Sequence, residues 1–151
     1  MPLDTTTLVL LSKVKEELNS SQRFLNAVKG WNSRILVNIC PPDPRIAYSY
    51  KVFLEIINGK CQTIRVLEPE EEVSADIQVT MDLGTYEELL KGRTSSISAA
   101  LRGRLKISGK KFELLKRREA LEVLNEVMRK LLFQGGAILT LLPYLRREFT
   151  F

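Results

Sequence analysis

The sequence from residue 46 to residue 67 reads IAYSYKVFLEIINGKCQTIRVL. Alternate positions from Tyr48 to Ile56 are apolar, and the polar residues Ser49, Lys51 and Glu55 lie between them, which is the period of a β-strand with one buried face. Asn58 and Gly59 separate this run from a second one at residues 60–67, and Asn-Gly between two such runs is the strongest short-range hairpin signal. The stretch therefore predicts two antiparallel strands.

Three more strands are expected on either side of this hairpin. Residues 33–40 alternate before it, and a proline-rich segment that begins at Pro41 ends the run. Residues 74–81 alternate after an acidic turn, and residues 104–108 form a short fifth run that Gly109 ends. Because the first three strands are joined by short links, they should form an antiparallel meander with one apolar and one polar face.

Helical periodicity covers most of the remaining chain. It predicts helices at residues 8–18, 24–30, 95–103 and 112–132, and a further one in which Thr85 and Glu88 form a capping box and Gly92 ends the helix. A sheet with one apolar face must be covered, and these helices are the available cover. The expected fold is an α+β domain of two layers that occupies residues 1–151.

Composition places the chain among ordinary folded proteins. Hydrophobic residues make up 44% and charged residues 27%. The two cysteines, Cys40 and Cys61, match no disulfide, zinc or redox pattern, so we expect two ordinary thiols. The N-terminal run lacks the basic flank and cleavage site of a secretory signal, and the C-terminus lacks a peroxisomal or prenylation address. We expect a cytoplasmic protein.

Basic charge is concentrated in one stretch. Residues 91–118 hold ten Lys or Arg and a single acid, Glu113, whereas the rest of the chain is net acidic. Such a patch attracts nucleic acid, an anionic membrane or a phosphorylated ligand, and by itself it does not choose among them.

The residues give little support to catalysis. The chain has no histidine, and it lacks the nucleophile elbow, the phosphate loop, the dinucleotide fingerprint and any cluster at metal-ligand spacing. Asp76 and Asp82 flank a strand end, but Asp76 falls on the polar face and Asp82 is placed to begin a helix. We therefore expect no enzyme, no catalytic residue, no metal and no cofactor.

Three blocks carry a resemblance to a known family. They are ADIQVTMD at residues 75–82, YEELLKG at residues 86–92 and AALRGRLKISG at residues 99–109. In this order they resemble the sterol carrier protein 2 family, which shows an alternating strand with an acidic residue, a helix that ends in Leu-x-x-Gly, and an apolar helix that runs into Gly-x-Leu-x-Ile-x-Gly. Weaker similarity extends over most of the chain.

The resemblance implies a five-stranded, mostly antiparallel sheet whose one face is covered by helices, with an apolar tunnel between the layers. Such a tunnel binds or transfers fatty acids, acyl-CoA, sterols or phospholipids and supplies no catalytic residues. Expected lining residues are Leu89, Leu90, Ile97, Leu101, Leu105, Ile107, Leu124, Met128, Leu139 and Leu142, with residues 138–145 as a lid. Expected contacts to a lipid head group or an anionic membrane are Arg102, Arg104, Lys110 and Lys111.

Other readings remain open from the residues alone. Periodicity does not distinguish a filled core from a ligand cavity, because both use the same residue types. The basic stretch also fits a nucleic-acid-binding protein, although Phe112 is its only aromatic residue for base stacking. A third hypothesis is a non-catalytic accessory subunit or homodimer that covers the apolar segment at residues 138–145.

Overall fold

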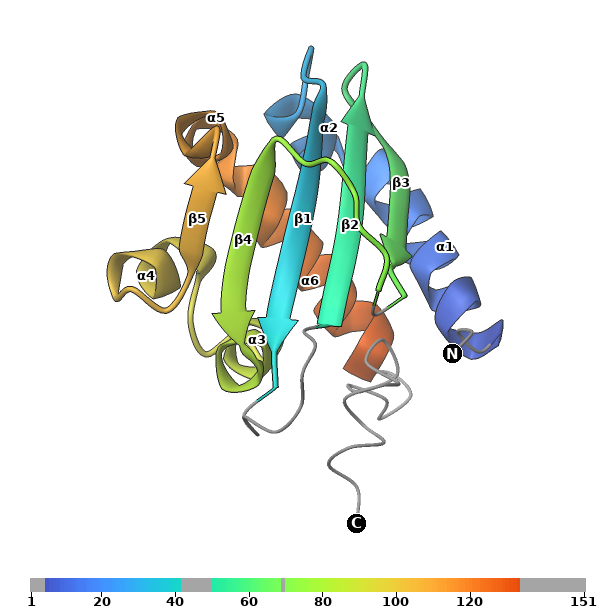
Figure 1. Ribbon diagram of the computed structural model, residues 1–151. Coiled ribbons are helices and arrows are strands. Elements are labelled where there is room, and N and C mark those ends of the chain that lie inside the picture. The colour runs from blue at the N-terminus through green and yellow to red at the C-terminus, as the bar shows by residue number, and fades with distance from the viewer. Residues whose placement is uncertain (1–4, 42–49, 69, 134–151) are drawn as a thin grey trace.

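Five strands form one sheet in the computed structural model, which describes residues 5–41, 50–68 and 70–133. The strands are β1 (Ser33–Cys40), β2 (Tyr50–Ile57), β3 (Lys60–Val66), β4 (Ile77–Asp82) and β5 (Lys106–Gly109). Their order across the sheet is β3-β2-β1-β4-β5, and every neighbouring pair is antiparallel except β1 and β4 (Figure 1). The expected five-stranded, mostly antiparallel sheet is confirmed.

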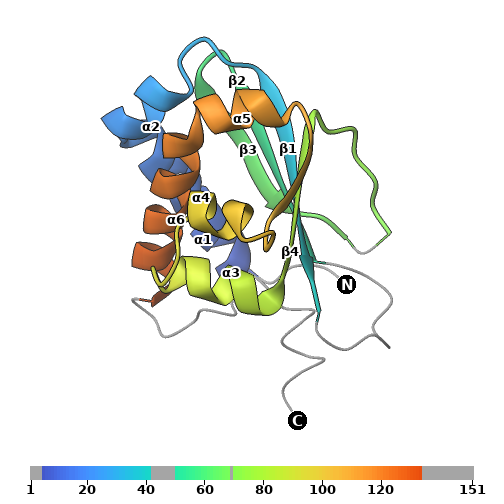
Figure 2. The ribbon, with the colours of Figure 1, turned by 90° about the vertical axis from the view of Figure 1, so that its left-hand side faces the viewer.

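Helices pack on one face of the sheet (Figures 1 and 2). They are α1 (Thr5–Ser20), α2 (Gln22–Ala27), α3 (Leu83–Leu90), α4 (Ser96–Leu101), α5 (Lys111–Lys116) and α6 (Arg118–Phe133). Helix α6 runs behind the middle of the sheet, and α1 lies beside it behind β3 and β2. The main hydrophobic core fills the space between these layers. The α+β two-layer class is therefore correct.

The hairpin at Asn58 and Gly59 forms as expected. These two residues connect β2 to β3 with φ of 51° and 71°, the left-handed geometry for which Asn-Gly is selected. The strand predicted at residues 46–57 is described from Tyr50 onward. Strand β4 begins at Ile77 rather than at residue 74, and β5 begins two residues later than expected and ends one residue later.

The second face of the sheet is not wholly polar, although the alternation predicts a polar face. Leu36, Phe53 and Leu67 are buried there, and Val73 and Ala75 pack against them. These last residues belong to the connection from β3 to β4, which crosses that face in front of β2 and β1 (Figures 1 and 2). The crossing chain thus shields the only apolar cluster described on this side.

The long helix predicted at residues 112–132 is two helices, α5 and α6, and the break lies at Arg117. The Arg117 Nη1 atom donates to the backbone oxygens of Ala27 and Lys29, each at 3.1 Å. Its guanidinium carbon also lies 4.9 Å from the centre of the Trp31 ring. These contacts tie the turn between α5 and α6 to the end of α2.

Arg117→Lys is therefore expected to lower the free energy of unfolding by about 1–2 kcal/mol, because an ammonium group cannot stack on Trp31 and serve both carbonyls in the same geometry. Urea denaturation followed by Trp31 fluorescence measures the change. Arg93→Lys is the matched control at an exposed position, where we expect less than about 0.5 kcal/mol. Equal stability of the two variants would contradict the role given to Arg117.

Candidate functional site

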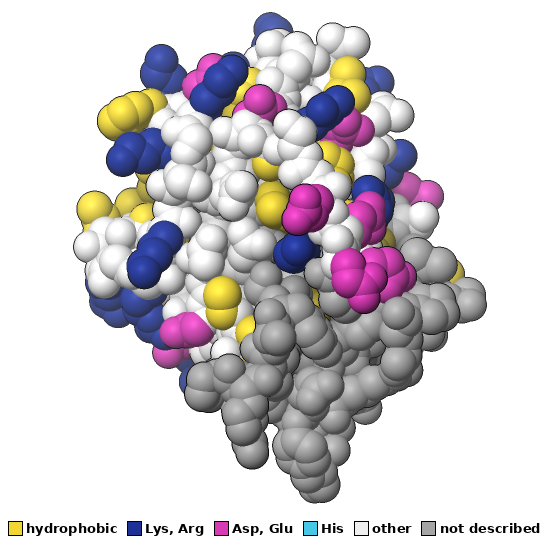
Figure 3. Space-filling view, in the orientation of Figure 1, with side chains coloured by type: hydrophobic (Ala, Val, Ile, Leu, Met, Phe, Trp, Pro, Cys, Tyr) yellow, Lys and Arg dark blue, Asp and Glu magenta, His cyan; other side chains and the backbone are white. Residues whose placement is uncertain are grey.

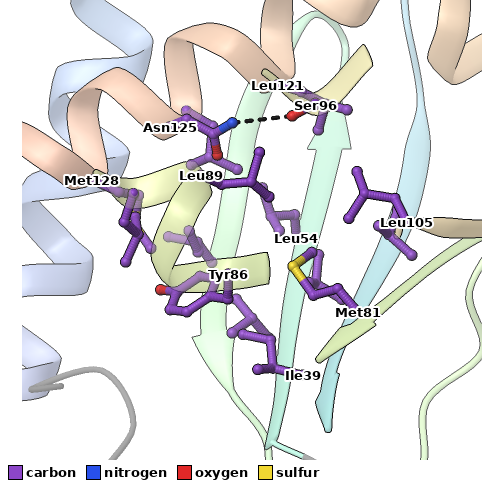
Figure 4. A pocket seen from close by; sticks show the side chains of 16 residues that line it. Ile39, Leu54, Met81, Tyr86, Leu89, Ser96, Leu105, Leu121, Asn125 and Met128 are labelled. Carbon is purple, nitrogen blue, oxygen red and sulfur yellow. Dashed lines mark hydrogen bonds between the residues drawn. The ribbon is translucent and has the colours of Figure 1, made fainter. Parts of the chain in front are cut away.

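An apolar cavity lies between the sheet and helices α3, α4 and α6 (Figure 4). Its volume is about 60 Å³. The wall contains no charged side chain and is formed by Val37, Ile39, Val52, Leu54, Ile64, Val79, Met81, Tyr86, Leu89, Leu90, Ser96, Leu105, Leu121, Leu124, Asn125 and Met128. Apart from a phenol, a hydroxyl and an amide, the cavity therefore offers only hydrocarbon and thioether surface.

A second, smaller cavity of about 20 Å³ adjoins the first. The two share Leu54, Leu121 and Leu124, and the second continues between α2, α6 and the far end of β1 and β2 toward Trp31. The shared leucines therefore lie between the two spaces. As the side chains stand, the first cavity has room for a few water molecules, since one needs roughly 10–15 Å³.

Helix α3 is fixed against the end of β4 by its first turn. Asp82, not Thr85, is the N-cap, and its Oδ1 accepts a hydrogen bond from the Thr85 N–H at 2.7 Å. This bond holds the pKa of the Asp82 carboxyl below its usual range. Asp82 therefore has the structural role that was expected of it, because it begins α3. The capping box predicted at Thr85 and Glu88 is wrong.

Helix α6 holds the other two helices of the cavity. The Arg129 Nε atom donates to the Leu90 oxygen at 2.7 Å at the end of α3. The Glu122 carboxylate accepts from the Ser96 N–H at 2.9 Å at the start of α4, and Asn125 donates to the Ser96 hydroxyl at 3.0 Å. The side chains of α6 therefore position both helices that cover the cavity.

Half of the predicted lining residues lie on the cavity wall, namely Leu89, Leu90, Leu105, Leu124 and Met128. Ile97 and Ile107 are half-buried and do not line it. The position of Leu101 was wrongly predicted, because its side chain is 83% exposed at the end of α4. Leu139 and Leu142, with the lid expected at residues 138–145, lie outside the described residues.

The sheet side of the cavity is missing from the sequence prediction. Residues of β1, β2, β3 and β4 supply it, among them Val37, Val52, Ile64 and Val79. The alternation of these strands marks the same positions as inward-facing, so the signal was present. Nothing in the sequence indicated that this inward face borders a cavity and not a filled core.

The predicted head-group contacts divide into two kinds. Arg104 is half-buried and committed to α3, because its Nη1 is 2.6 Å from the Glu88 carboxylate and its Nε donates to the Thr85 hydroxyl at 3.1 Å. Arg102, Lys110 and Lys111 are exposed, and none of them forms an ion pair with another described residue. The role expected of Arg104 is therefore not supported by its position.

The remaining reactive groups have structural surroundings. Cys61 is buried, and burial raises its pKa to about 11, so the thiol is protonated and inert at neutral pH. Asp76 accepts from the Arg34 N–H at 2.9 Å. Within residues 5–41, 50–68 and 70–133 there is no group of three Cys, Asp or Glu side chains placed to hold a metal. In the same ranges no helix has the length and hydropathy needed to cross a bilayer.

Comparison with known proteins agrees with this architecture. A model described as the SCP-2 sterol transfer family matches residues 11–122. No curated protein matches the chain. A crystal structure of sterol carrier protein 2 shares 27% identity over 82% of this chain and 95% of its own, with a TM-score of 0.68.

Two further solved structures are similar. A conserved hypothetical protein from Thermus thermophilus, described as possibly a sterol carrier protein, shares 26% identity over 86% of this chain and 91% of its own, with a TM-score of 0.68. Sterol carrier protein 2 from Yarrowia lipolytica has the same fold at 17% identity, with coverage of 84% and 97% and a TM-score of 0.53. Because the family model spans more than half of the sequence, this chain belongs to the SCP-2 sterol transfer family.

Proposed function

We propose that this protein binds a lipid-like molecule between the sheet and helices α3, α4 and α6, and carries it without chemical change. The observation behind this proposal is the cavity, whose sixteen lining residues include no charge and few polar atoms. Burial of hydrocarbon against such a wall is favourable by about 25 cal/mol per Å² of apolar surface. Membership of a sterol transfer family supports the same class of ligand.

The ligand must move side chains to enter. Ligand pockets usually enclose some hundreds of Å³, and the two adjoining cavities are far smaller. Leu54, Leu121 and Leu124 separate these cavities, and Met81 and Met128 have flexible side chains at the first one. We therefore expect a hydrocarbon chain or ring system to occupy both spaces after these side chains rotate.

Native mass spectrometry of the gently purified full chain tests the proposal. The expected result is a bound molecule of lipid mass that organic extraction releases, together with saturable uptake of a fluorescent fatty alcohol by the extracted protein. Absence of both a co-purified lipid and saturable uptake would overturn the proposal.

A second function is favoured by the edge of the molecule formed by α4, β5 and α5. Leu101 is 83% exposed and Phe112 70% exposed there, and Arg102, Lys106, Lys110 and Lys111 are exposed on or next to the same three elements. Figure 3 shows basic and hydrophobic side chains interspersed along this edge. Apolar side chains beside basic ones fit an anionic membrane surface, to which each basic residue contributes about 1 kcal/mol. We propose that this edge docks on membranes to collect or deliver the ligand.

Replacement of both Leu101 and Phe112 by serine is expected to weaken binding to vesicles that contain phosphatidylserine by roughly tenfold or more, because two apolar side chains no longer insert. Vesicle co-sedimentation measures the affinity, and vesicles of phosphatidylcholine alone should bind weakly. Val9→Ser, at an exposed position on α1, is the control and should bind normally. Unchanged binding by the double variant, or binding of DNA in place of vesicles, would contradict this docking site.

A further inference from the structure

The cavity wall contains one buried hydroxyl whose hydrogen bonds are not accounted for. Tyr86 on α3 is 8% exposed, and its Oη atom is buried without a hydrogen-bond partner among the described residues. In Figure 4 its ring lies among the lining side chains, and its oxygen is directed toward the side of the cavity that carries Met128. Buried polar groups are nearly always paired, so this hydroxyl calls for a partner.

The other polar groups of the wall do not supply that partner. Asn125 donates to the Ser96 hydroxyl at 3.0 Å, and both lie at the opposite end of the cavity from Tyr86 (Figure 4). The remaining lining side chains of the cavity are hydrocarbon or thioether. Burial raises the pKa of the Tyr86 phenol, which therefore stays protonated and can donate one hydrogen bond and accept others.

The helix that carries this hydroxyl is fixed by contacts on either side of Tyr86. Asp82 caps the helix one turn before Tyr86, and Arg104 bonds to Thr85 and Glu88 on either side of it. A polar group that is held rigidly in an apolar wall discriminates between ligands, because a ligand without a matching atom leaves it unpaired.

We propose that the Tyr86 hydroxyl pairs with a single uncharged oxygen, a hydroxyl or carbonyl, of an otherwise apolar ligand. This inference rests on the proposed function and narrows it to neutral lipids such as alcohols and ketones. A carboxylate is disfavoured at this position, because no cation lines the cavity to offset the loss of its hydration.

The test compares the full chain with its Tyr86→Phe variant in displacement of a solvatochromic dye by decane, decanol and decanoate. The substitution keeps the ring and removes only the hydroxyl. We expect the Kd of decanol to rise about fivefold in the variant, as loss of one hydrogen bond predicts, while the Kd of decane stays unchanged or falls. Decanoate should bind more weakly than decanol to the unaltered chain.

The outcomes separate the two proposals. Failure of all three compounds to displace the dye from the unaltered chain would overturn the proposed function itself. If both decane and decanol displace the dye and Tyr86→Phe changes their Kd values by the same factor, the role of Tyr86 is overturned but the proposed function is not. Without ligand, Tyr86→Phe should melt at the same or a higher temperature, because it removes an unpaired buried hydroxyl. A marked fall in melting temperature would show that the hydroxyl bonds to the protein and would also overturn the inference.

Discussion

Replacement of Leu89 by tryptophan is expected to reduce the uptake of an apolar ligand by roughly tenfold or more. Leu89 is 3% exposed and lies on the α3 side of the cavity wall. The indole would occupy the space that the ligand needs, and the ligand would then have to displace a large rigid ring. Uptake of a fluorescent fatty alcohol measures the effect.

Leu101→Trp is the matched control for this variant. It makes the same substitution at a side chain that is 83% exposed on α4, so it should leave uptake unchanged in the absence of membranes. Circular dichroism should show that Leu89→Trp remains folded, with a loss of stability of about 1–3 kcal/mol from overpacking. Normal uptake by the folded Leu89→Trp variant would contradict the assignment of the cavity as the ligand site.

Gly109→Ala is expected to be among the most damaging single substitutions, with a loss of about 3 kcal/mol or more of unfolding free energy. Gly109 has φ of +84°, and a Cβ atom there would lie 2.1 Å from the backbone oxygen of Asp76. The same oxygen accepts the Lys110 N–H at 3.0 Å, so the clash falls where β5 ends against β4. Chemical denaturation measures the loss.

Gly103→Ala separates the cost of a left-handed backbone conformation from the cost of a steric clash with the added Cβ atom. Gly103 has a similar φ of +74°, but a Cβ atom there meets nothing within 4 Å. We expect it to cost only the left-handed conformation, about 1–2 kcal/mol. If the two variants lose the same stability, the contact between Gly109 and Asp76 does not have the importance given to it. The two glycines flank Leu105 and Ile107 in the sequence block that resembles the family, and the contact at Gly109 gives a physical reason for its last glycine.

Local signals predicted the elements of the fold well. Asn58 and Gly59 determined the hairpin, and the period-two runs identified each strand to within a few residues. Alternation says which face of a strand is buried but not which strand lies beside it. The parallel pairing of β1 with β4 therefore could not be read from the residues themselves, and the family resemblance implied only that the sheet is mostly antiparallel.

The errors have a common cause in contacts between residues that are distant in sequence. Helical periodicity over residues 112–132 gave no sign of the break at Arg117, whose side chain bonds to the end of α2. Helical spacing placed Leu101 with Ile97 on an inward face, but Leu101 is the last of the six residues of α4 and its side chain is 83% exposed. The cavity itself was not predictable from periodicity, because cores and pockets use the same side chains.

Methyl NMR of the full chain with bound decanol tests the central claim most directly. With methyl-labelled protein, we predict intermolecular NOEs from the decanol chain to the methyl groups of Val79, Met81 and Leu89, which line the cavity on the sheet and on α3. NOEs confined to exposed methyl groups such as those of Leu101 and Val9, or no NOEs at saturating decanol, would contradict an internal ligand site.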